Sequence, residues 1–353
     1  MTRLLSLMLA IPLLAACSDV PQGASPTASV PVAPAIDGEP IDGGPIDGGQ
    51  APTLADAGDA GLAGGESIAV VNSCTLPSMP SPGAMTAEKD LVYASPGGAP
   101  QALDIYAPTK PGTHPLVVLV HGGGWATGDK QGFAQVAAKL TTLGYVAASV
   151  NYRLVQEGGA NTFPTQVSDV RCAVRWLRAH AAEHGIDPLR VGALGGSAGA
   201  HLVAMLGVGA NVAGLDDGTC PAALASQPVG VDAVVGDYAP MDFRDPVVWA
   251  NNDSDGTGVF NMLGSTAPQV AALASPITHV SPSSAPFFLA HGTADTKVPV
   301  EQSRTFRAAL QGAGGRATIV ELPGVGHGFP AISEQLPRTS CTTVAFLGKY
   351  LTP

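Results

Sequence analysis

The sequence predicts an α/β fold in which a mostly parallel central sheet carries helices on both faces. Short apolar runs that are typical of buried strands alternate with stretches whose apolar residues recur at helical spacing. One run, Leu116-Val117-Val118-Leu119-Val120, contains no polar residue, as expected of a parallel strand that is covered on both faces. The alternation extends over residues 67–353, which is enough chain for one large domain.

The expected elements follow from these patterns in chain order. Residues 242–284 are polar and irregular and too long for a simple connection, so we expect them to form a small cap region over the functional site. Strands are expected over 91–94, 103–106, 116–120, 145–151, 190–194, 231–235, 287–290 and 318–322, and helices over 133–143, 165–184, 200–206, 301–311 and a last stretch that ends near Leu351.

Residues 1–16 have the layout of a secretory signal peptide. Arg3 precedes an apolar run that is too short to span a bilayer. The run ends in Leu14-Ala15-Ala16-Cys17, which resembles the lipobox of bacterial lipoproteins. That resemblance implies cleavage before Cys17, a lipid on Cys17, and a protein that is anchored to a bacterial membrane and faces the periplasm or exterior. The alternative is an ordinary signal peptide that is cut near Ala16. Both place the protein outside the cytoplasm.

Residues 17–66 are expected to be a tether that begins with the lipidated cysteine. From residue 18 on, this segment holds 7 Pro and 10 Gly, with no aromatic residue and no Lys or Arg. Such a composition cannot bury enough apolar surface to offset the entropy of ordering, which predicts disorder. A five-residue Ile-Asp-Gly repeat runs from Ile36 to Gln50, but it lacks the pattern of calcium-binding repeats.

The negative charge of the chain is concentrated in this tether. The net charge is −11 for the whole chain, whereas residues 67–353 hold 20 acidic and 16 basic residues. The expected domain is therefore only mildly acidic, and no basic patch predicts a nucleic-acid partner.

Four cysteines remain when Cys17 is set aside. In an exported protein an even number predicts disulfides, and four cysteines allow two bridges in three connectivities. No Cys-x-x-Cys or Cys/His spacing predicts a zinc site, and no metal is expected. The four are Cys74, Cys172, Cys220 and Cys341.

A Gly-x-Ser-x-Gly motif stands between an expected strand and an expected helix. In Gly195-Gly196-Ser197-Ala198-Gly199 the small residues permit a sharp turn that raises the Ser197 hydroxyl group above the sheet. The following helix directs its first N–H groups toward whatever Ser197 attacks.

Three further motifs follow expected strands. His121-Gly122-Gly123-Gly124-Trp125 comes after the strand at 116–120, and it has neither the Lys-Ser/Thr ending of a P-loop nor the spacing of a dinucleotide-binding loop. His291-Gly292-Thr293-Ala294-Asp295 follows the expected strand at 287–290, and Gly324-Val325-Gly326-His327 follows the expected strand at 318–322. Ser197, Asp295 and His327 thus occur in the order serine, acid, histidine.

These motifs together resemble the α/β-hydrolase superfamily, and most closely its H-G-G-G carboxylesterases and lipases in the bacterial feruloyl and acetylxylan esterase-like group. Agreement extends over about 90–351 and includes further stretches outside the four motifs. They are Leu103-Asp104-Ile105-Tyr106, Asn151-Tyr152-Arg153, Val174-Arg175-Trp176-Leu177-Arg178 and Ala274-Ser275-Pro276-Ile277-Thr278.

The resemblance implies an α/β-hydrolase fold and a Ser–His–Asp catalytic triad. Ser197 is the expected nucleophile, His327 the general base, and Asp295 the acid that orients the imidazole. The backbone N–H groups of Ala198, Gly123 and Gly124 are expected to form the oxyanion hole. Neither a metal nor an organic cofactor is implied.

Other polar residues near these motifs have alternative interpretations. Asp237 and Asp242 are rival candidates for the triad acid, although they follow one strand too early. His201 and His121 are expected to be structural hydrogen-bonding groups rather than catalysts.

The family's arrangement of helices also bears on the disulfides. It implies that the helices before and after the nucleophile strand share one face of the sheet. Cys172 would then pair with Cys220, and Cys74 with Cys341.

Three functions fit the resemblance. The first is hydrolysis of short-acyl or plant-polysaccharide-type esters, with a small-molecule or polysaccharide-linked substrate. The second is amide hydrolysis by a peptidase or formamidase on the same fold. The third is a non-catalytic surface adhesion protein, which the retention of all three triad residues disfavours.

Overall fold

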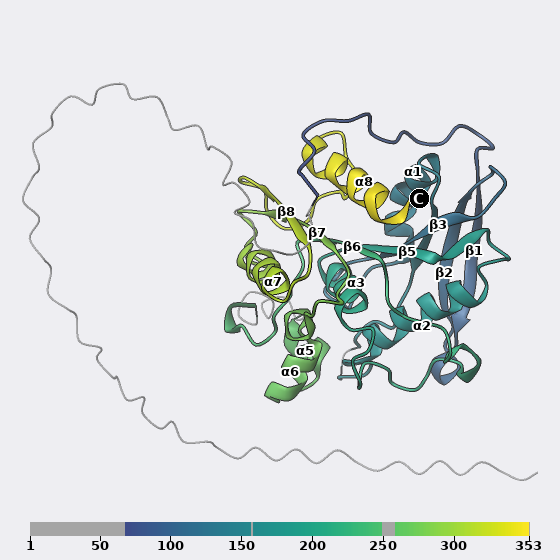
Figure 1. The fold of residues 1–353 in the computed structure, drawn as a ribbon. Coiled ribbons are helices and arrows are strands. Elements are labelled where there is room, and N and C mark those ends of the chain that lie inside the picture. Colours follow the sequence, from purple (N-terminus) through teal and green to yellow (C-terminus); the bar gives the residue numbers. More distant parts are fainter. Residues whose placement is uncertain (1–67, 157, 249–257, 353) are drawn as a thin grey trace, which may run out of the picture. The chain divides into compact units, whose positions relative to one another are not determined.

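In the described residues, eight strands form one sheet (Figure 1). The computed structural model describes residues 68–156, 158–248 and 258–352. The strands lie in the order β1-β2-β4-β3-β5-β6-β7-β8; β2 pairs antiparallel with β1 and β4, and the remaining pairs are parallel. This confirms the mostly parallel sheet. The strands are β1 (Met85–Ala94), β2 (Gln101–Pro108), β3 (His114–Val120), β4 (Val146–Val150), β5 (Ile186–Gly196), β6 (Ala233–Asp237), β7 (Phe287–Gly292) and β8 (Ala317–Leu322).

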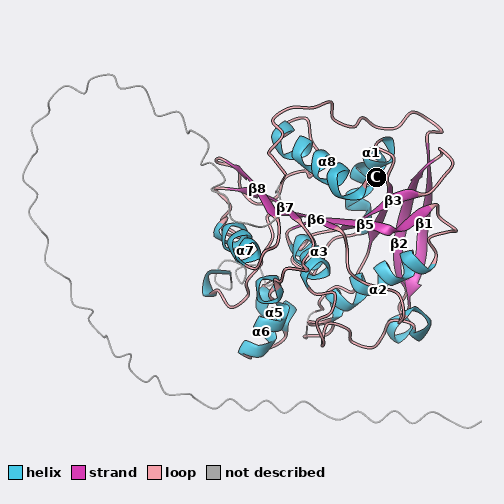
Figure 2. Cartoon of the chain, in the orientation of Figure 1, coloured by secondary structure: helices cyan, strands magenta, loops and turns pink. Residues whose placement is uncertain are grey.

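Helices cover both faces of the sheet. Figure 2 shows α1 and α8 on one side of the sheet and α2, α3 and α7 on the other. The helices are α1 (Ala134–Thr142), α2 (Thr165–Ala179), α3 (Ala198–Val208), α5 (Val259–Leu263), α6 (Pro268–Ala274), α7 (Glu301–Gly312) and α8 (Pro337–Leu351), with short 3₁₀ turns at Pro96–Gly98, Lys130–Phe133, Ala222–Leu224 and Pro276–His279.

The two helical layers explain why the central strands are apolar throughout. Successive side chains of a strand point to opposite faces. In β3, Val117 and Leu119 enter the apolar cluster that includes residues of α1 and α8, whereas Val118 and Val120 enter the cluster beneath α2 and α3. A strand with water on one face would alternate polar and apolar residues, and β3 has no such face.

Several expected elements differ in extent from the structure, and for two of them the reason is physical. The expected strand over 91–94 is the end of β1, whose first half is exposed and polar and so carries no apolar pattern. The expected helix over 165–184 ends at Ala179, because the chain turns at His180 and again at Gly185, which has φ 64°. The helix α2 is therefore shorter than its apolar spacing predicts.

Two disulfides fasten peripheral segments to the helices. Cys172 of α2 is bonded to Cys220 in the loop that follows α3, and Cys74 is bonded to Cys341 of α8. These are the two pairs expected from the family resemblance. The segment around Cys74 also runs along α8, where the Val71 N–H donates to Thr342 Oγ1 over 3.0 Å.

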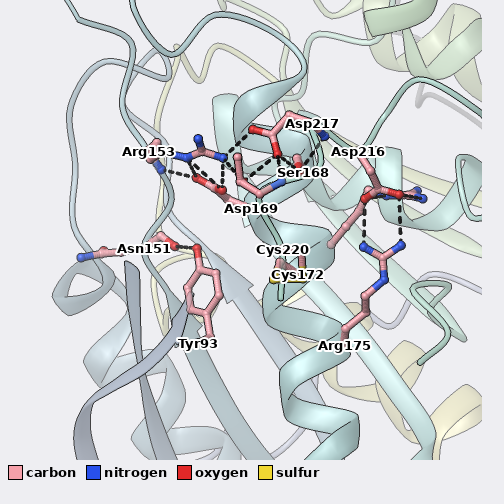
Figure 3. The surroundings of a disulfide bond; sticks show 12 residues. Tyr93, Asn151, Arg153, Ser168, Asp169, Cys172, Arg175, Asp216, Asp217 and Cys220 are labelled. Atoms are coloured by element: carbon pink, nitrogen blue, oxygen red, sulfur yellow. Dashed lines mark hydrogen bonds and ion pairs between the residues drawn. A yellow bond between two sulfur atoms is a disulfide. The ribbon is translucent and has the colours of Figure 1, made fainter. Parts of the chain in front are cut away.

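Ion pairs reinforce the first of these disulfides (Figure 3). Asp217, close to Cys220, accepts from Arg153 over 2.6 Å and from Ser168 over 2.8 Å. Its neighbour Asp216 accepts two hydrogen bonds from Arg175 at 2.9 and 3.0 Å. The loop before Cys220 is thus attached to α2 by hydrogen bonds and ion pairs as well as by the disulfide.

The expected cap region, 242–284, contains α5 and α6 in its described part. The Ala274 carbonyl group at the end of α6 lies 2.9 Å from His201 Nε2 of α3, so this part of the segment packs on the α3 side of the sheet. Residues 249–257 lie outside the described residues. The expected signal peptide, the tether and Cys17 also lie outside them.

Candidate active site

The three expected triad residues lie just beyond the carboxyl ends of three parallel strands. Ser197 directly follows β5, Asp295 follows β7 and His327 follows β8. In a parallel sheet these ends share one edge, which is where α/β proteins bind their ligands. Residues far apart in the sequence are brought together there.

Ser197 occupies a tight turn between β5 and α3. Its φ is 55° and its ψ is −123°, a conformation that L residues rarely adopt. The Ser197 N–H donates to Asp237 O over 2.9 Å. A Cβ atom at Gly199 would lie 2.0 Å from Val120 O. Only glycine allows α3 to begin this close to β3, which explains the second glycine of the motif.

His327 connects the serine to the aspartate. Its Nε2 lies 2.9 Å from Ser197 Oγ, and its Nδ1 lies 2.7 Å from Asp295 Oδ2. The structure thus brings the three residues into one hydrogen-bonded chain, with the imidazole between a hydroxyl group and a carboxylate.

The Asp295 carboxylate is held by several donors. Oδ1 accepts from the Lys297 and Val298 N–H groups, each over 2.9 Å. His291 Nε2 lies 3.3 Å from Oδ2. Burial by itself would raise the pKa of Asp295, but hydrogen bonds with His291, His327 and the Val298 N–H outweigh it and hold the pKa well below its usual range. Asp295 is therefore ionised at neutral pH and faces the imidazole as an anion.

The glycine loop runs directly beside the serine turn. A Cβ atom at Gly122 would lie 2.8 Å from Gly196 O. Gly123 and Gly124 have φ values of 111° and 57°, and within the described residues no acceptor binds their N–H groups. Ala198 is the first residue of α3, so its N–H has no carbonyl partner inside the helix. These are the three groups expected to form the oxyanion hole.

Two other histidines make hydrogen bonds away from Ser197, although His121 Nε2 is buried with no partner among the described residues. His201 is fully buried, with Nδ1 accepting from Trp125 Nε1 over 3.2 Å. Burial lowers its pKa to about 4, so it stays neutral. His121 Nδ1 lies 2.8 Å from Gly122 O, and the ring stacks on Tyr152. Neither ring forms a hydrogen bond with Ser197 Oγ, as His327 does.

The rival acids do not contact His327. Asp242 forms an ion pair with Arg244 over 2.7 Å. Asp237 ends β6 with 1% of its surface exposed, and burial raises its pKa to about 8. Its carboxyl group is therefore mainly protonated at neutral pH, which is the wrong state for stabilising an imidazolium.

A cavity of about 780 Å³ opens in front of Ser197. Its wall combines apolar side chains with amide, ammonium and carboxyl groups. None of the described residues of the expected cap region contributes to it. Beyond the glycine loop, Ser197 and His327, the lining includes Gln131, Phe133, Gln135, Val136, Lys139, Asp237, Tyr238, Lys297, Phe329, Pro330, Ala331 and Ile332.

One wall of this cavity is fastened to the sheet by a buried lysine. Lys130 is the first residue of the 3₁₀ turn Lys130–Phe133 and immediately precedes the lining residue Gln131. Its Nζ lies 3.0 Å from Asp104 Oδ1 and 2.8 Å from Asp90 Oδ1. Its N–H donates to Asn151 Oδ1 over 2.6 Å. This wall is not predictable from the sequence, because Asp90 of β1, Asp104 of β2 and Asn151 just after β4 share no local pattern.

Within 68–156, 158–248 and 258–352, no group of three or more His, Cys, Asp or Glu side chains is placed to hold a metal ion. In the same residues, every helix is too short or too polar to cross a bilayer.

The chain is similar in sequence to several esterases. Esterase LipQ of Mycobacterium tuberculosis is 33% identical over 290 residues, which cover 77% of this chain and 65% of LipQ. Esterase LipC of the same organism is 35% identical over 243 residues, or 65% of this chain and 57% of LipC. This chain therefore spans less than two thirds of the length of either relative.

Solved structures of esterases have the same fold. A truncated carbohydrate esterase from gut microbiota superposes with a TM-score of 0.66 at 27% identity, covering 78% of this chain and all of that one. Esterase 2 of Thermogutta terrifontis, phosphorylated by paraoxon, gives a TM-score of 0.61 at 28% identity and covers 78% of this chain and 98% of its own.

The family assignment comes from a match over most of the domain. The sequence model of the BD-FAE family matches residues 103–310, which is more than half of the chain. This range begins in β2 and ends in α7, and it includes the glycine loop, Ser197 and Asp295. The chain belongs to the BD-FAE family and has the α/β-hydrolase fold.

Proposed function

We propose that the protein is a serine carboxylic-ester hydrolase that acts on short-acyl or plant-polysaccharide-type esters through an acyl-enzyme. One observation carries the proposal. Ser197, His327 and Asp295 form a hydrogen-bonded chain with contacts of 2.9 and 2.7 Å, and Ser197 and His327 line a cavity. A hydroxyl group in such a chain is activated as a nucleophile.

The first half of the reaction forms the acyl-enzyme. His327 Nε2 takes the proton from Ser197 Oγ as the oxygen attacks the ester carbonyl carbon, and a tetrahedral intermediate forms. The imidazolium then gives the proton to the departing alkoxide, and the carbon–oxygen bond of the ester breaks. The ionised Asp295 stabilises the imidazolium through Nδ1. In the second half, water takes the place of Ser197 Oγ as the nucleophile, and His327 transfers protons in the same way.

The oxyanion of the tetrahedral intermediate needs hydrogen-bond donors that are already in position. The N–H groups of Gly123, Gly124 and Ala198 lie on the two segments that meet beside Ser197. Loss of one such donor costs about 2.7–4 kcal/mol of transition-state stabilisation in serine hydrolases. The positive φ values of both glycines support this role, because residues with a side chain disfavour them.

The substrate class is supported by the cavity and by the names of similar proteins. A volume of about 780 Å³ lies within the range of small-molecule sites. One structural neighbour is described as a carbohydrate esterase, and sequence relatives are named as esterases. The lining combines apolar side chains with a few amide and ammonium groups, which is the mixture typical of small-molecule sites.

The experiment that tests the function compares ester and amide hydrolysis. The purified protein is incubated with p-nitrophenyl acetate, with acetylated xylan, with a feruloyl ester and with an aminoacyl anilide. Ester hydrolysis is expected, and Ser197→Ala should reduce it at least about 10⁴-fold. Ser283→Ala, which changes an exposed serine away from the cavity, is the control. Hydrolysis of the anilide alone, or activity of Ser197→Ala close to that of the parent, would overturn the proposal.

We also propose that the protein is attached to a membrane. The motif Leu14-Ala15-Ala16-Cys17 supports a lipid on Cys17. The Pro/Gly-rich segment that follows would act as a linker that lets the domain bind substrates at a distance from the membrane surface. A bacterial membrane, with the enzyme on its periplasmic or outer side, is the proposed location.

A further inference from the structure

A buried carboxyl oxygen in the wall of the cavity has no hydrogen-bond partner among the described residues. Asp237 is 1% exposed, and its Oδ1 is fully buried with no hydrogen-bond partner among the described residues. Buried polar groups almost always have partners, because an unpaired one costs free energy of folding. Asp237 also belongs to the lining of the cavity.

The strand pattern of β6 shows which way this carboxyl group points. Val235 enters the apolar cluster that includes residues of α1 and α8, whereas Val234 enters the opposite cluster. Asp237 is two residues after Val235 and therefore projects from the same face. That face carries the cavity, whose wall includes Gln135 and Val136 of α1.

Asp237 also lies next to the nucleophile. It pairs with Gly196 in the β5–β6 register, and its carbonyl oxygen accepts the Ser197 N–H over 2.9 Å. The backbone of Asp237 thus adjoins the serine turn, and Asp237 and Ser197 line the same cavity.

The carboxyl group is suited to neutral hydrogen bonding. Burial raises its pKa to about 8, so at neutral pH it has one O–H donor and acceptor lone pairs. The other titratable side chains of the cavity wall are His121, Lys139, Tyr238, Lys297 and His327. Tyr238, the next residue, already donates to Phe329 O over 3.3 Å.

Neither a structural nor a triad role accounts for Asp237. The triad position beside His327 Nδ1 is already occupied by Asp295, whose Oδ2 lies 2.7 Å away. A structural carboxyl group would make hydrogen bonds that repay its burial, and no described residue provides one to Oδ1.

We propose that Asp237 is a specificity-determining residue that hydrogen-bonds a hydroxyl group of the bound ester close to the scissile bond. The proposal rests on the esterase function proposed above. A hydroxyl group both donates and accepts, as does the neutral carboxyl group. An alkyl group of the same size would leave the carboxyl group without a partner in the complex, which disfavours that substrate relative to the hydroxylated one. The enzyme is therefore expected to prefer hydroxylated esters over alkyl esters of equal size.

Two pairs of isosteric substrates separate the two sides of the ester bond. On the acyl side, p-nitrophenyl 3-hydroxybutyrate is compared with p-nitrophenyl 3-methylbutyrate. On the alcohol side, 2-hydroxyethyl acetate is compared with propyl acetate in a pH-stat. The measured quantity is the ratio of kcat/KM within each pair, for the full-length protein and its variants.

The wild type should prefer the hydroxylated member of at least one pair by about tenfold or more. Asp237→Leu, which keeps the size but removes the polar group, should abolish that preference by slowing the hydroxylated ester. Asp237→Ala gives a second variant that lacks the carboxyl group. Asp237→Asn keeps a donor and an acceptor and should retain the preference within about threefold. Tyr238→Phe should retain it as well.

The outcomes are distinguishable. Equal rates within both pairs for the wild type would overturn the role of Asp237, and so would a preference that survives in both Asp237→Leu and Asp237→Ala. Failure of the wild type to hydrolyse even p-nitrophenyl acetate would instead overturn the proposed esterase function, and this proposal with it. A preference that is lost in Asp237→Leu and Asp237→Ala but kept in Asp237→Asn and Tyr238→Phe would support Asp237 as the residue that recognises the hydroxyl group.

Discussion

Asp295 and Asp237 show how position decides the state of a carboxyl group. Asp295 accepts hydrogen bonds from two backbone N–H groups and faces two imidazole rings, which keep it ionised. Asp237 has comparable burial without these donors, and its pKa is raised to about 8. One aspartate can therefore stabilise a positive charge on His327, whereas the other can act as a neutral donor.

The first residue-scale prediction concerns the choice of triad acid. Asp295→Asn removes the negative charge and favours the wrong tautomer of His327, so kcat/KM for p-nitrophenyl acetate should fall by about 10⁴-fold. Asp242→Asn is the matched control, because Asp242 pairs with Arg244 instead. Its kcat/KM should stay near that of the wild type. A larger loss in the Asp242 variant than in the Asp295 variant would refute the assignment.

The second residue-scale prediction concerns how the free energy of unfolding depends on pH. The pKa of Asp237 is about 8 in the folded protein and about 4 in an unfolded chain, so between these values the folded state holds a proton that the unfolded state has released. Wild-type stability should therefore fall with rising pH relative to Asp237→Asn, by about 1.4 kcal/mol per pH unit within that window. Urea unfolding of both proteins at several pH values measures the difference. A difference that does not change with pH would show that Asp237 is not protonated in the folded protein.

The sequence predicts the triad more readily than it predicts Asp237. Ser197, Asp295 and His327 stand in local motifs beside glycines, and these motifs can be recognised one at a time. From the sequence, Asp237 is only an alternative to Asp295 as the triad acid. Its protonation is not predictable there, because it depends on burial by segments that are distant in the sequence. The wall pinned by Lys130 was missed for the same reason.

At the scale of elements, the strands and helices of the core are predictable because each carries its own period. The continuous apolar run of β3 follows from its two covered faces. The limits of an element are not predictable from its own sequence when contacts with distant segments set them. The polar first half of β1 is a strand because it pairs with β2, and the end of α2 is set by the turn toward β5. The proposed cap segment packs on α3 in its described part, and its composition does not indicate which face it covers.

The disulfides provide a prediction at this scale. Cys172 and Cys220 are 48 residues apart, and their bond restricts the unfolded chain. Replacing both with alanine should lower the free energy of unfolding by about 2–4 kcal/mol while leaving kcat/KM nearly unchanged, since neither lies in the cavity. Urea unfolding without reductant measures the loss. An unchanged midpoint would mean that the ion pairs of Asp216 and Asp217 are sufficient to hold the loop.

At the scale of the whole molecule, the order of the motifs is what made the fold predictable. A glycine loop, a nucleophile turn, an acid and a histidine, each after a strand, specify a parallel sheet with one functional edge. The disulfide pairing followed from that fold, since it depends on which helices share a face. The cavity did not follow, because its wall is assembled from 3₁₀ and helical residues around α1 and from the loop after His327.

The prediction for the whole molecule concerns its attachment. If Cys17 carries a lipid, the wild type should be found in the membrane fraction. Cys17→Ser should move it to the soluble fraction with kcat/KM unchanged, because Cys17 precedes the domain by about fifty residues. Fractionation with an immunoblot measures this. Finding the wild type wholly in the soluble fraction would rule out the anchor.

The most direct test of the central claim is to identify the residue that becomes covalently modified. Paraoxon reacts with an activated serine by displacement of p-nitrophenolate, which leaves a diethylphosphoryl group on the attacking oxygen. Peptide mapping by mass spectrometry after treatment should find this group on Ser197, with none on Ser197→Ala. The His327→Gln variant should react much more slowly, because its serine has no base. An adduct on another residue, or no adduct under conditions in which the protein hydrolyses esters, would contradict the assignment of Ser197 as the nucleophile.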